Sequence, residues 1–125
     1  MTTQPNRPPR RPATQPFCAI HSAQQLIGGK WTLIVVWHLR EGRKRFSEIE
    51  RAIGDVSQKA LTDALKHLEG AGLLTRTVFA QVPPRVEYAL TPLGRTLLPI
   101  VEAIELWAGR HQSEITRGDG HSVVA

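Results

Sequence analysis

The amino-acid sequence predicts a mainly α-helical α+β fold, and three features of the chain support this prediction. Residues 46–69 contain two amphipathic helical patterns that are separated by a short turn. Two β-rich runs follow, at residues 74–79 and 86–90, with a Pro-Pro pair between them. A last helical pattern begins at Thr91-Pro92, because threonine is a good N-cap and proline is favoured at the first helical position. We therefore expect a helical domain that carries one β-hairpin.

Two helical segments are expected before this core. Apolar residues recur with helical spacing over residues 19–27, and Gly28-Gly29 ends the pattern. Residues 31–39 are nearly all apolar, and their β-branched members would also suit a buried strand. The apolar run extends to about eleven residues, which is long for a strand. We therefore predict a buried helix here.

Capping residues define the central pair of helices. Ser47 and Glu50 have the spacing of a capping box at the start of a short helix, and Gly54 then marks a turn. Ser57 is a good N-cap for the next helix. Leucines with helical spacing predict the inward face of that helix: Leu61, Leu65 and Leu68.

The last helix is expected to be long. Its apolar stripe runs from Leu93 to Trp107, and Pro99 lies inside it and should bend it. The predicted order is then helix, helix, helix, turn, helix, strand, strand, helix. That order is a winged helix-turn-helix with extra N- and C-terminal helices.

Length and composition indicate one folded domain between two tails. Residues 1–16 are rich in proline and arginine and read as a disordered basic tail, residues 17–112 form the predicted domain, and residues 113–125 read as a flexible C-terminal tail. No segment looks like a signal peptide or a membrane span, and a single cysteine rules out an internal disulfide. These features predict a cytoplasmic protein.

The net charge of +5 is unevenly distributed. Residues 28–95 hold eleven Lys or Arg against seven Asp or Glu, whereas residues 96–125 carry an acidic excess. The basic middle of the chain is therefore the expected surface for a polyanion. The five histidines show no metal-ligand spacing, and no nucleophile elbow, phosphate loop or carboxylate pair appears. We expect no enzymatic activity, no metal and no cofactor.

The helix that begins after Ser57 has a polar face suited to reading DNA bases. Subtracting its inward leucines leaves Gln58, Lys59, Thr62, Asp63, Lys66 and His67 outward. Gln58 can contact adenine, Lys59 can reach guanine or a phosphate, and Thr62 can pack on a thymine methyl group. Asp63 could accept from a cytosine amino group, although phosphates would repel it. The alternative is that these residues form only a solvated helix face.

Basic residues flank this helix in the sequence. Arg43-Lys44-Arg45 can lie along the DNA backbone, and Arg85 at the wing tip can enter the minor groove or hold a phosphate. Arg76 is interpreted as a strand-surface residue. The predicted DNA-binding residues are Arg43, Lys44, Arg45, Ser57, Gln58, Lys59, Thr62, Lys66 and Arg85. The sequence thus predicts a regulator that binds double-stranded DNA, with a protein-interaction module or a non-specific DNA-binding protein as alternatives.

Several strings of the chain resemble a known family of regulators. They are Leu26-Ile27-Gly28-Gly29-Lys30-Trp31, Arg45-Phe46, Val82-Pro83-Pro84-Arg85-Val86-Glu87-Tyr88 and Leu90-Thr91-Pro92-Leu93-Gly94. These residues resemble HxlR-type winged helix-turn-helix regulators over residues 17–108. The resemblance implies a bacterial cytosolic homodimer, paired through the first and last helices and often repressing from a near-palindromic operator. The long apolar stripe of the last helix agrees with a dimer.

Cys18 occupies the position at which some members of this family sense oxidants or electrophiles. The expected regulatory residues are Cys18 and His21, because a helix N-terminus and a protonated histidine both favour a thiolate. Ala19 and His21 stand where the family pattern has Pro and Glu, so the sequence departs from it here. The alternative is a small packed residue at the dimer seam. A small-molecule effector, bound near the tryptophans, is another possible signal.

Overall fold

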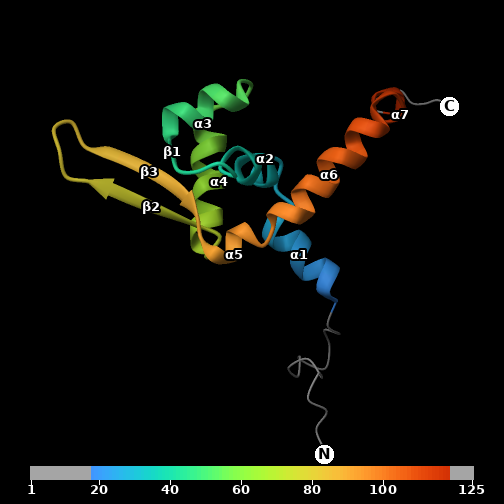
Figure 1. Ribbon diagram of the computed structural model, residues 1–125, viewed down its shortest axis with the longest axis horizontal. Coiled ribbons are helices and arrows are strands. Elements are labelled where there is room, and N and C mark those ends of the chain that lie inside the picture. The colour runs from blue at the N-terminus through green and yellow to red at the C-terminus, as the bar shows by residue number, and fades with distance from the viewer. Residues whose placement is uncertain (1–17, 119–125) are drawn as a thin grey trace, which may run out of the picture.

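The computed structural model describes residues 18–118, which form a helical core with a projecting β-hairpin (Figure 1). The elements in chain order are α1 (Ala19–Ile27), α2 (Thr32–His38), β1 (Lys44–Arg45), α3 (Phe46–Ile53), α4 (Gln58–Gly70), β2 (Leu74–Phe79), β3 (Arg85–Leu90), α5 (Pro92–Arg95), α6 (Leu98–Arg110) and α7 (Gln112–Gly118). This order confirms the predicted winged helix-turn-helix. The predicted N-terminal tail, residues 1–16, lies outside the described residues, as do residue 17 and part of the predicted C-terminal tail, residues 119–125.

The core forms where α2, α3 and α4 pack together with Leu74 and Tyr88 of the sheet. Val35 and Val36 of α2 are fully buried, as are Ile49 of α3 and Leu61 and Leu68 of α4. Segment 32–38 is therefore a buried helix rather than a strand, as predicted. The β-branched side chains of α2 are accommodated because tertiary burial outweighs their weak preference against helices.

The sheet has three antiparallel strands in the order β1-β3-β2. Strand β2 pairs with β3 from Leu74↔Leu90 to Phe79↔Arg85, and this hairpin is the wing. Strand β1 pairs Lys44 with Tyr88 and was not predicted, because two residues carry no alternating pattern of their own. The added strand ties the basic segment before α3 to the wing.

The start of α3 corrects the predicted capping box. The helix begins at Phe46, and the backbone N–H of Arg45 donates to Oε1 of Glu48 at 2.8 Å. Ser47 and Glu50 are thus inside the helix rather than at its cap. Pairing of Arg45 with Glu87 in the sheet sets this boundary, since the chain turns into the helix directly after β1. Gly54, at φ 90°, ends α3 in a conformation that other residues rarely adopt.

The predicted long last helix is in fact several helices. Helix α5 ends at Arg95, and Pro99 lies in the first turn of α6 rather than in a helix interior. A continuous helix would place the Pro99 ring against the carbonyl of Arg95, so the chain tightens at Thr96 and restarts. Thr91 is the N-cap of α5, as predicted, and its hydroxyl accepts from the N–H of Gly94 at 3.0 Å.

Helices α6 and α7 extend from the core on the side opposite the wing (Figure 1). Only Val101 is buried in α6, and no residue is buried in α1. Helix α7 continues through residues that the sequence placed in the C-terminal tail. No helix among the described residues is long and apolar enough to cross a membrane.

Candidate nucleic-acid interface

The helix-turn-helix consists of α3, the turn at 54–57 and α4. Ser57 is the N-cap of α4, as predicted, and its hydroxyl accepts from the N–H of Ala60 at 3.0 Å. The buried leucines Leu61, Leu65 and Leu68 direct one side of α4 into the core. Because helical residues three or four apart share a face, the other side must point outward.

The outward side of α4 is the reading face, defined as Gln58, Lys59, Thr62, Asp63, Lys66 and His67. Thr62 is partly buried, and the other five residues are exposed. The reading face begins in the first turn of the helix, which is where a recognition helix usually meets base edges. The predicted polar face therefore exists and is accessible in the described part of the chain.

An ion pair lies in the middle of the reading face. Nζ of Lys59 lies 2.9 Å from Oδ2 of Asp63, one helical turn away. This hydrogen bond, together with the charge of Asp63, raises the pKa of the Lys59 ammonium, so the lysine is charged at neutral pH. Both side chains are mostly exposed, and such pairs add little to stability. The pair can therefore exchange its mutual contact for contacts to a ligand at small cost.

A second charged cluster lies along β3 of the wing, around Glu87. Nη1 of Arg43 is 3.4 Å from Oε1 of Glu87, and Nε of Arg85 is 3.1 Å from Oε2 of the same carboxylate. The Glu87 side chain is only 16% exposed. The Arg85 guanidinium also lies 4.4 Å from the centre of the Phe79 ring. One half-buried carboxylate thus holds two arginines, and the cluster keeps a net positive charge.

A hollow of about 380 Å³ separates the wing from the N-terminal ends of α3 and α4. It brings together three predicted DNA-binding residues from distant segments: Arg45, Gln58 and Arg85. Gln81 and Pro84 of the wing loop complete its rim. Gln81 was not singled out from the sequence, because nothing in the local pattern shows which side of the loop faces α4.

Arg76 joins the reading face through the tertiary structure. This residue of β2 lines a second hollow, of about 320 Å³, together with Thr62 and Lys66 of α4. From the sequence it was interpreted as a strand-surface residue, and it is indeed exposed. Its position beside α4 depends on how β2 packs against that helix, which a strand pattern alone does not reveal.

The predicted regulatory residues lie apart from this surface. Cys18 precedes α1 and is exposed, and its carbonyl accepts from the N–H of Ser22 at 3.0 Å. His21 is exposed on α1. Helix α1 projects from the core away from the wing loop (Figure 1). Among residues 18–118, no three His, Cys, Asp or Glu side chains are grouped closely enough to hold a metal ion.

A winged helix with an exposed reading helix and a basic wing defines a class of protein, the helix-turn-helix transcriptional regulators that bind DNA. Comparison with known proteins gives the family. The family model described as HxlR-like helix-turn-helix matches residues 26–116, and the chain belongs to this family. The resemblance seen in the sequence is thereby confirmed.

Relatives and solved structures agree with this assignment. An HTH-type transcriptional regulator of Methanothermobacter thermautotrophicus is 45% identical over 99 residues, covering 77% of this chain and 76% of the relative. The redox regulator HypR in its reduced form is 39% identical, with a TM-score of 0.75 over 79% of this chain and 98% of HypR. The reduced form of the transcriptional regulator YodB of Bacillus subtilis is 35% identical, with a TM-score of 0.65 over 74% of this chain and 91% of YodB.

Proposed function

We propose that the protein is a sequence-specific repressor that acts in the cytoplasm and binds a near-palindromic operator as a homodimer. In this proposal α4 enters the major groove, and the wing with Arg43, Lys44 and Arg45 contacts the sugar-phosphate backbone. The observation that carries the proposal is the hollow in which Arg45, Gln58 and Arg85 meet beside the reading face. The cationic side chains of Arg45 and Arg85 and the base-reading amide of Gln58 therefore lie on one surface.

The Lys59–Asp63 pair supplies a specific element of recognition. A G·C pair presents two acceptors, O6 and N7 of guanine, beside one donor, the amino group of cytosine, in the major groove. An ammonium and a carboxylate 2.9 Å apart offer the complementary donor and acceptor. We therefore expect Lys59 and Asp63 to read one G·C pair together, with Gln58 and Thr62 reading its neighbours.

Exposed apolar side chains support the homodimer. Ile20 on α1 is 74% exposed, and Ile104 and Trp107 on α6 are 45% and 58% exposed. Exposed apolar side chains grouped on a helix mark an interaction site, and a two-fold axis covers the same residues on both copies. A two-fold dimer would also set its two α4 helices about 34 Å apart, one turn of DNA.

A titration with DNA tests the proposal. The protein should bind the region upstream of its own gene more tightly than unrelated DNA, by about a thousandfold or more. Between roughly 50 and 200 mM salt, affinity for both DNAs should fall, because phosphate contacts release counterions. Equal affinity for all sequences would leave a non-specific DNA-binding protein. No DNA affinity at low salt would leave a protein-interaction module.

A second proposal concerns regulation by oxidation of Cys18. The observation that favours it is the likeness to HypR and YodB, of which HypR is described as a redox regulator. Cys18 is exposed and directly precedes α1, so an oxidant can reach its thiol. Two electrons and the thiol protons would pass to an oxidant such as diamide, leaving a disulfide to a second subunit or to a small thiol. A peroxide would instead yield a sulfenic acid.

Replacing Cys18→Ser tests this second proposal. Diamide should release the unmodified protein from its operator and leave the variant bound, because serine cannot form the disulfide. Ser22→Ala, one turn further along α1, is the matched control and should respond like the unmodified protein. Release of both variants by diamide would exclude Cys18 as the sensor.

A further inference from the structure

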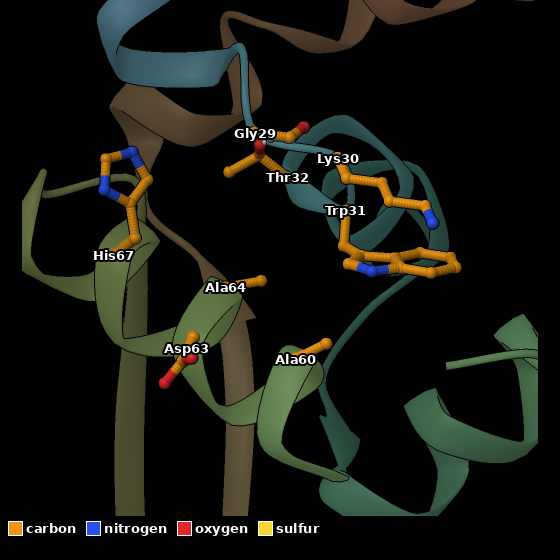
Figure 2. Close-up of a pocket in the computed structure, with 8 residues that line it drawn as sticks. All are labelled: Gly29, Lys30, Trp31, Thr32, Ala60, Asp63, Ala64 and His67. Atoms are coloured by element: carbon orange, nitrogen blue, oxygen red, sulfur yellow. Dashed lines mark hydrogen bonds between the residues drawn. The ribbon is translucent and has the colours of Figure 1, made fainter. Parts of the chain in front are cut away.

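A pocket of about 300 Å³ lies between the α1–α2 turn and the recognition helix α4, and it shares Asp63 and His67 with the edge of the reading face. Gly29, Lys30, Trp31 and Thr32 form one wall, and Ala60, Asp63, Ala64 and His67 of α4 form the other (Figure 2). We call this pocket the slot. The two walls come from segments about thirty residues apart in the chain, so the slot exists only in the folded protein.

Small side chains leave the slot open. Figure 2 shows the Cβ atoms of Ala60 and Ala64 facing the turn that carries the Trp31 indole, and both alanines line the pocket. The turn is held in place by Thr32, which is 2% exposed and donates its hydroxyl to the carbonyl of Gly29 at 2.8 Å. The walls are thus an indole and two alanines on rigid backbone, a shape that suits a flat ring.

The charges around the slot favour an anionic ligand. The Asp63 carboxylate is paired with Lys59 and points away from the Trp31 indole (Figure 2). The Lys30 ammonium lies 5.2 Å from the centre of that indole, and no carboxylate of residues 18–118 forms an ion pair with it. Its flexible side chain is exposed and can reach the mouth of the slot. The volume lies at the lower end for small-molecule sites, which corresponds to one or two rings.

A ligand in the slot would touch two parts of the molecule that a hydrogen bond already joins. Nε2 of His67, near the end of α4, lies 2.6 Å from the carbonyl oxygen of Leu26, near the end of α1. His67 also lines the slot. The spacing between α1 and α4 therefore depends on contacts in and beside the slot. A ligand that binds one spacing better than another shifts the position of the reading face.

We infer that the slot binds a small planar aromatic anion, such as an aromatic carboxylate, and that its occupancy changes the affinity of α4 for DNA. The ring stacks between Trp31 and the two alanines, and Lys30 pairs with the negative group. The second half of this inference rests on the proposed DNA-binding function, whereas ligand binding itself does not.

Calorimetry with 1-naphthoate tests the slot. The unmodified protein should bind 1-naphthoate more tightly than the neutral 1-naphthamide or the cationic 1-naphthylmethylamine. Ala64→Leu fills the slot and Lys30→Gln removes the charge, and each should weaken binding by roughly tenfold or more. Ala52 on α3 and Arg95 on α5 are exposed, so the variants Ala52→Leu and Arg95→Gln are the matched controls. Both variants should bind 1-naphthoate as tightly as the unmodified protein does.

A measurement on the unmodified protein covers the case in which a variant fails to fold. The ring current of bound 1-naphthoate should shift the NMR signal of the Trp31 indole N–H and leave that of Trp107 in place. The slot would be overturned as an anion site if this shift were absent. The same would follow if the three naphthalene compounds bound equally, or if folded Ala64→Leu bound 1-naphthoate as the unmodified protein does.

The coupling to DNA is measured separately. Saturating 1-naphthoate should change operator affinity by about fivefold or more in the unmodified protein, and not in Ala64→Leu. Binding of 1-naphthoate with unchanged operator affinity would overturn the regulatory half of the inference. Binding of 1-naphthoate by a protein that shows no DNA affinity at all would instead refute the proposed function and leave the slot intact.

Discussion

At the residue scale, two charged clusters of the proposed interface differ in how freely their members can contact DNA. Lys59 and Asp63 form an exposed pair on α4, whereas Arg43 and Arg85 share the half-buried carboxylate of Glu87. Base reading requires groups that can exchange partners, and backbone contact requires charge at a defined place. We therefore assign sequence reading to the reading face and sequence-independent affinity to the arginines.

Substitutions separate these two roles. Lys59→Ala combined with Thr62→Ala should remove the preference for the operator, since each lost base contact costs roughly 1–3 kcal/mol of discrimination. Arg43→Ala should weaken binding to every DNA alike. It should also reduce the slope of the logarithm of the binding constant against the logarithm of the salt concentration by about one, because one phosphate contact is lost. Fluorescence anisotropy with operator and scrambled DNA at several salt concentrations measures both effects. Equal loss of preference in the two variants would refute this division of roles.

His38 gives the stability of the protein a dependence on pH. Burial lowers the pKa of His38, and the charges of Arg40 and Lys44 lower it further. The unfolded chain therefore takes up a proton on His38 at a higher pH than the folded protein does. The contribution of neutral His38 to the stability of the fold is complete above 6.5, the ordinary pKa of histidine. It is lost as the pH falls from there through the pKa of His38 in the folded protein.

Urea unfolding measures this effect. Between about pH 7.5 and pH 5.5, the free energy of unfolding should fall more in the unmodified protein than in His38→Gln, because glutamine does not titrate in this range. The other titrating groups are common to both proteins and cancel in the comparison. An identical fall in the two proteins would show that His38 titrates alike in both states.

At the element scale, the boundaries of α3 and α4 depend on different contacts. Helix α4 begins at its side-chain cap, Ser57, which the sequence identified. Helix α3 begins where β1 ends, and its first contact comes from Glu48 rather than from Ser47. The local capping signal was therefore right for α4 and wrong for α3, where pairing of Arg45 with Glu87 in the sheet sets the boundary.

Two serine substitutions test this difference. Ser57→Ala should lower the free energy of unfolding by about 1 kcal/mol, since it removes the hydroxyl that accepts from the N–H of Ala60. Ser47→Ala should change it by less than about 0.5 kcal/mol, because Ser47 is exposed inside α3. Urea or thermal unfolding compares the two variants. A larger loss for Ser47→Ala would restore the capping box that the sequence suggested.

At the scale of the whole molecule, α1 and α6 carry apolar residues that the single chain leaves exposed. A single chain leaves Ile104 and Trp107 uncovered on a helix that projects from the core (Figure 1). The second copy of the proposed dimer would cover them.

Sedimentation tests the proposed dimer. The unmodified protein should sediment as a dimer at micromolar concentration, and Ile104→Glu should shift it toward monomer, because a charge would be buried at the interface. Val78→Glu is the control, since Val78 is equally apolar and is exposed on the wing. A monomeric unmodified protein, or a fully dimeric Ile104→Glu variant, would contradict the assignment of α6 to the interface.

The sequence by itself determined the order and type of nearly all elements, the reading face and the family. These rest on local signals, such as the leucine spacing of α4, the Ser57 and Thr91 caps and the strings around Trp31 and Tyr88. The tertiary structure alone decided strand β1, the start of α3, the break between α5 and α6, the pairing of two arginines with Glu87, and the slot. The physical reason is that each of these depends on contacts between residues far apart in the chain, whereas periodicity and capping report only on neighbours.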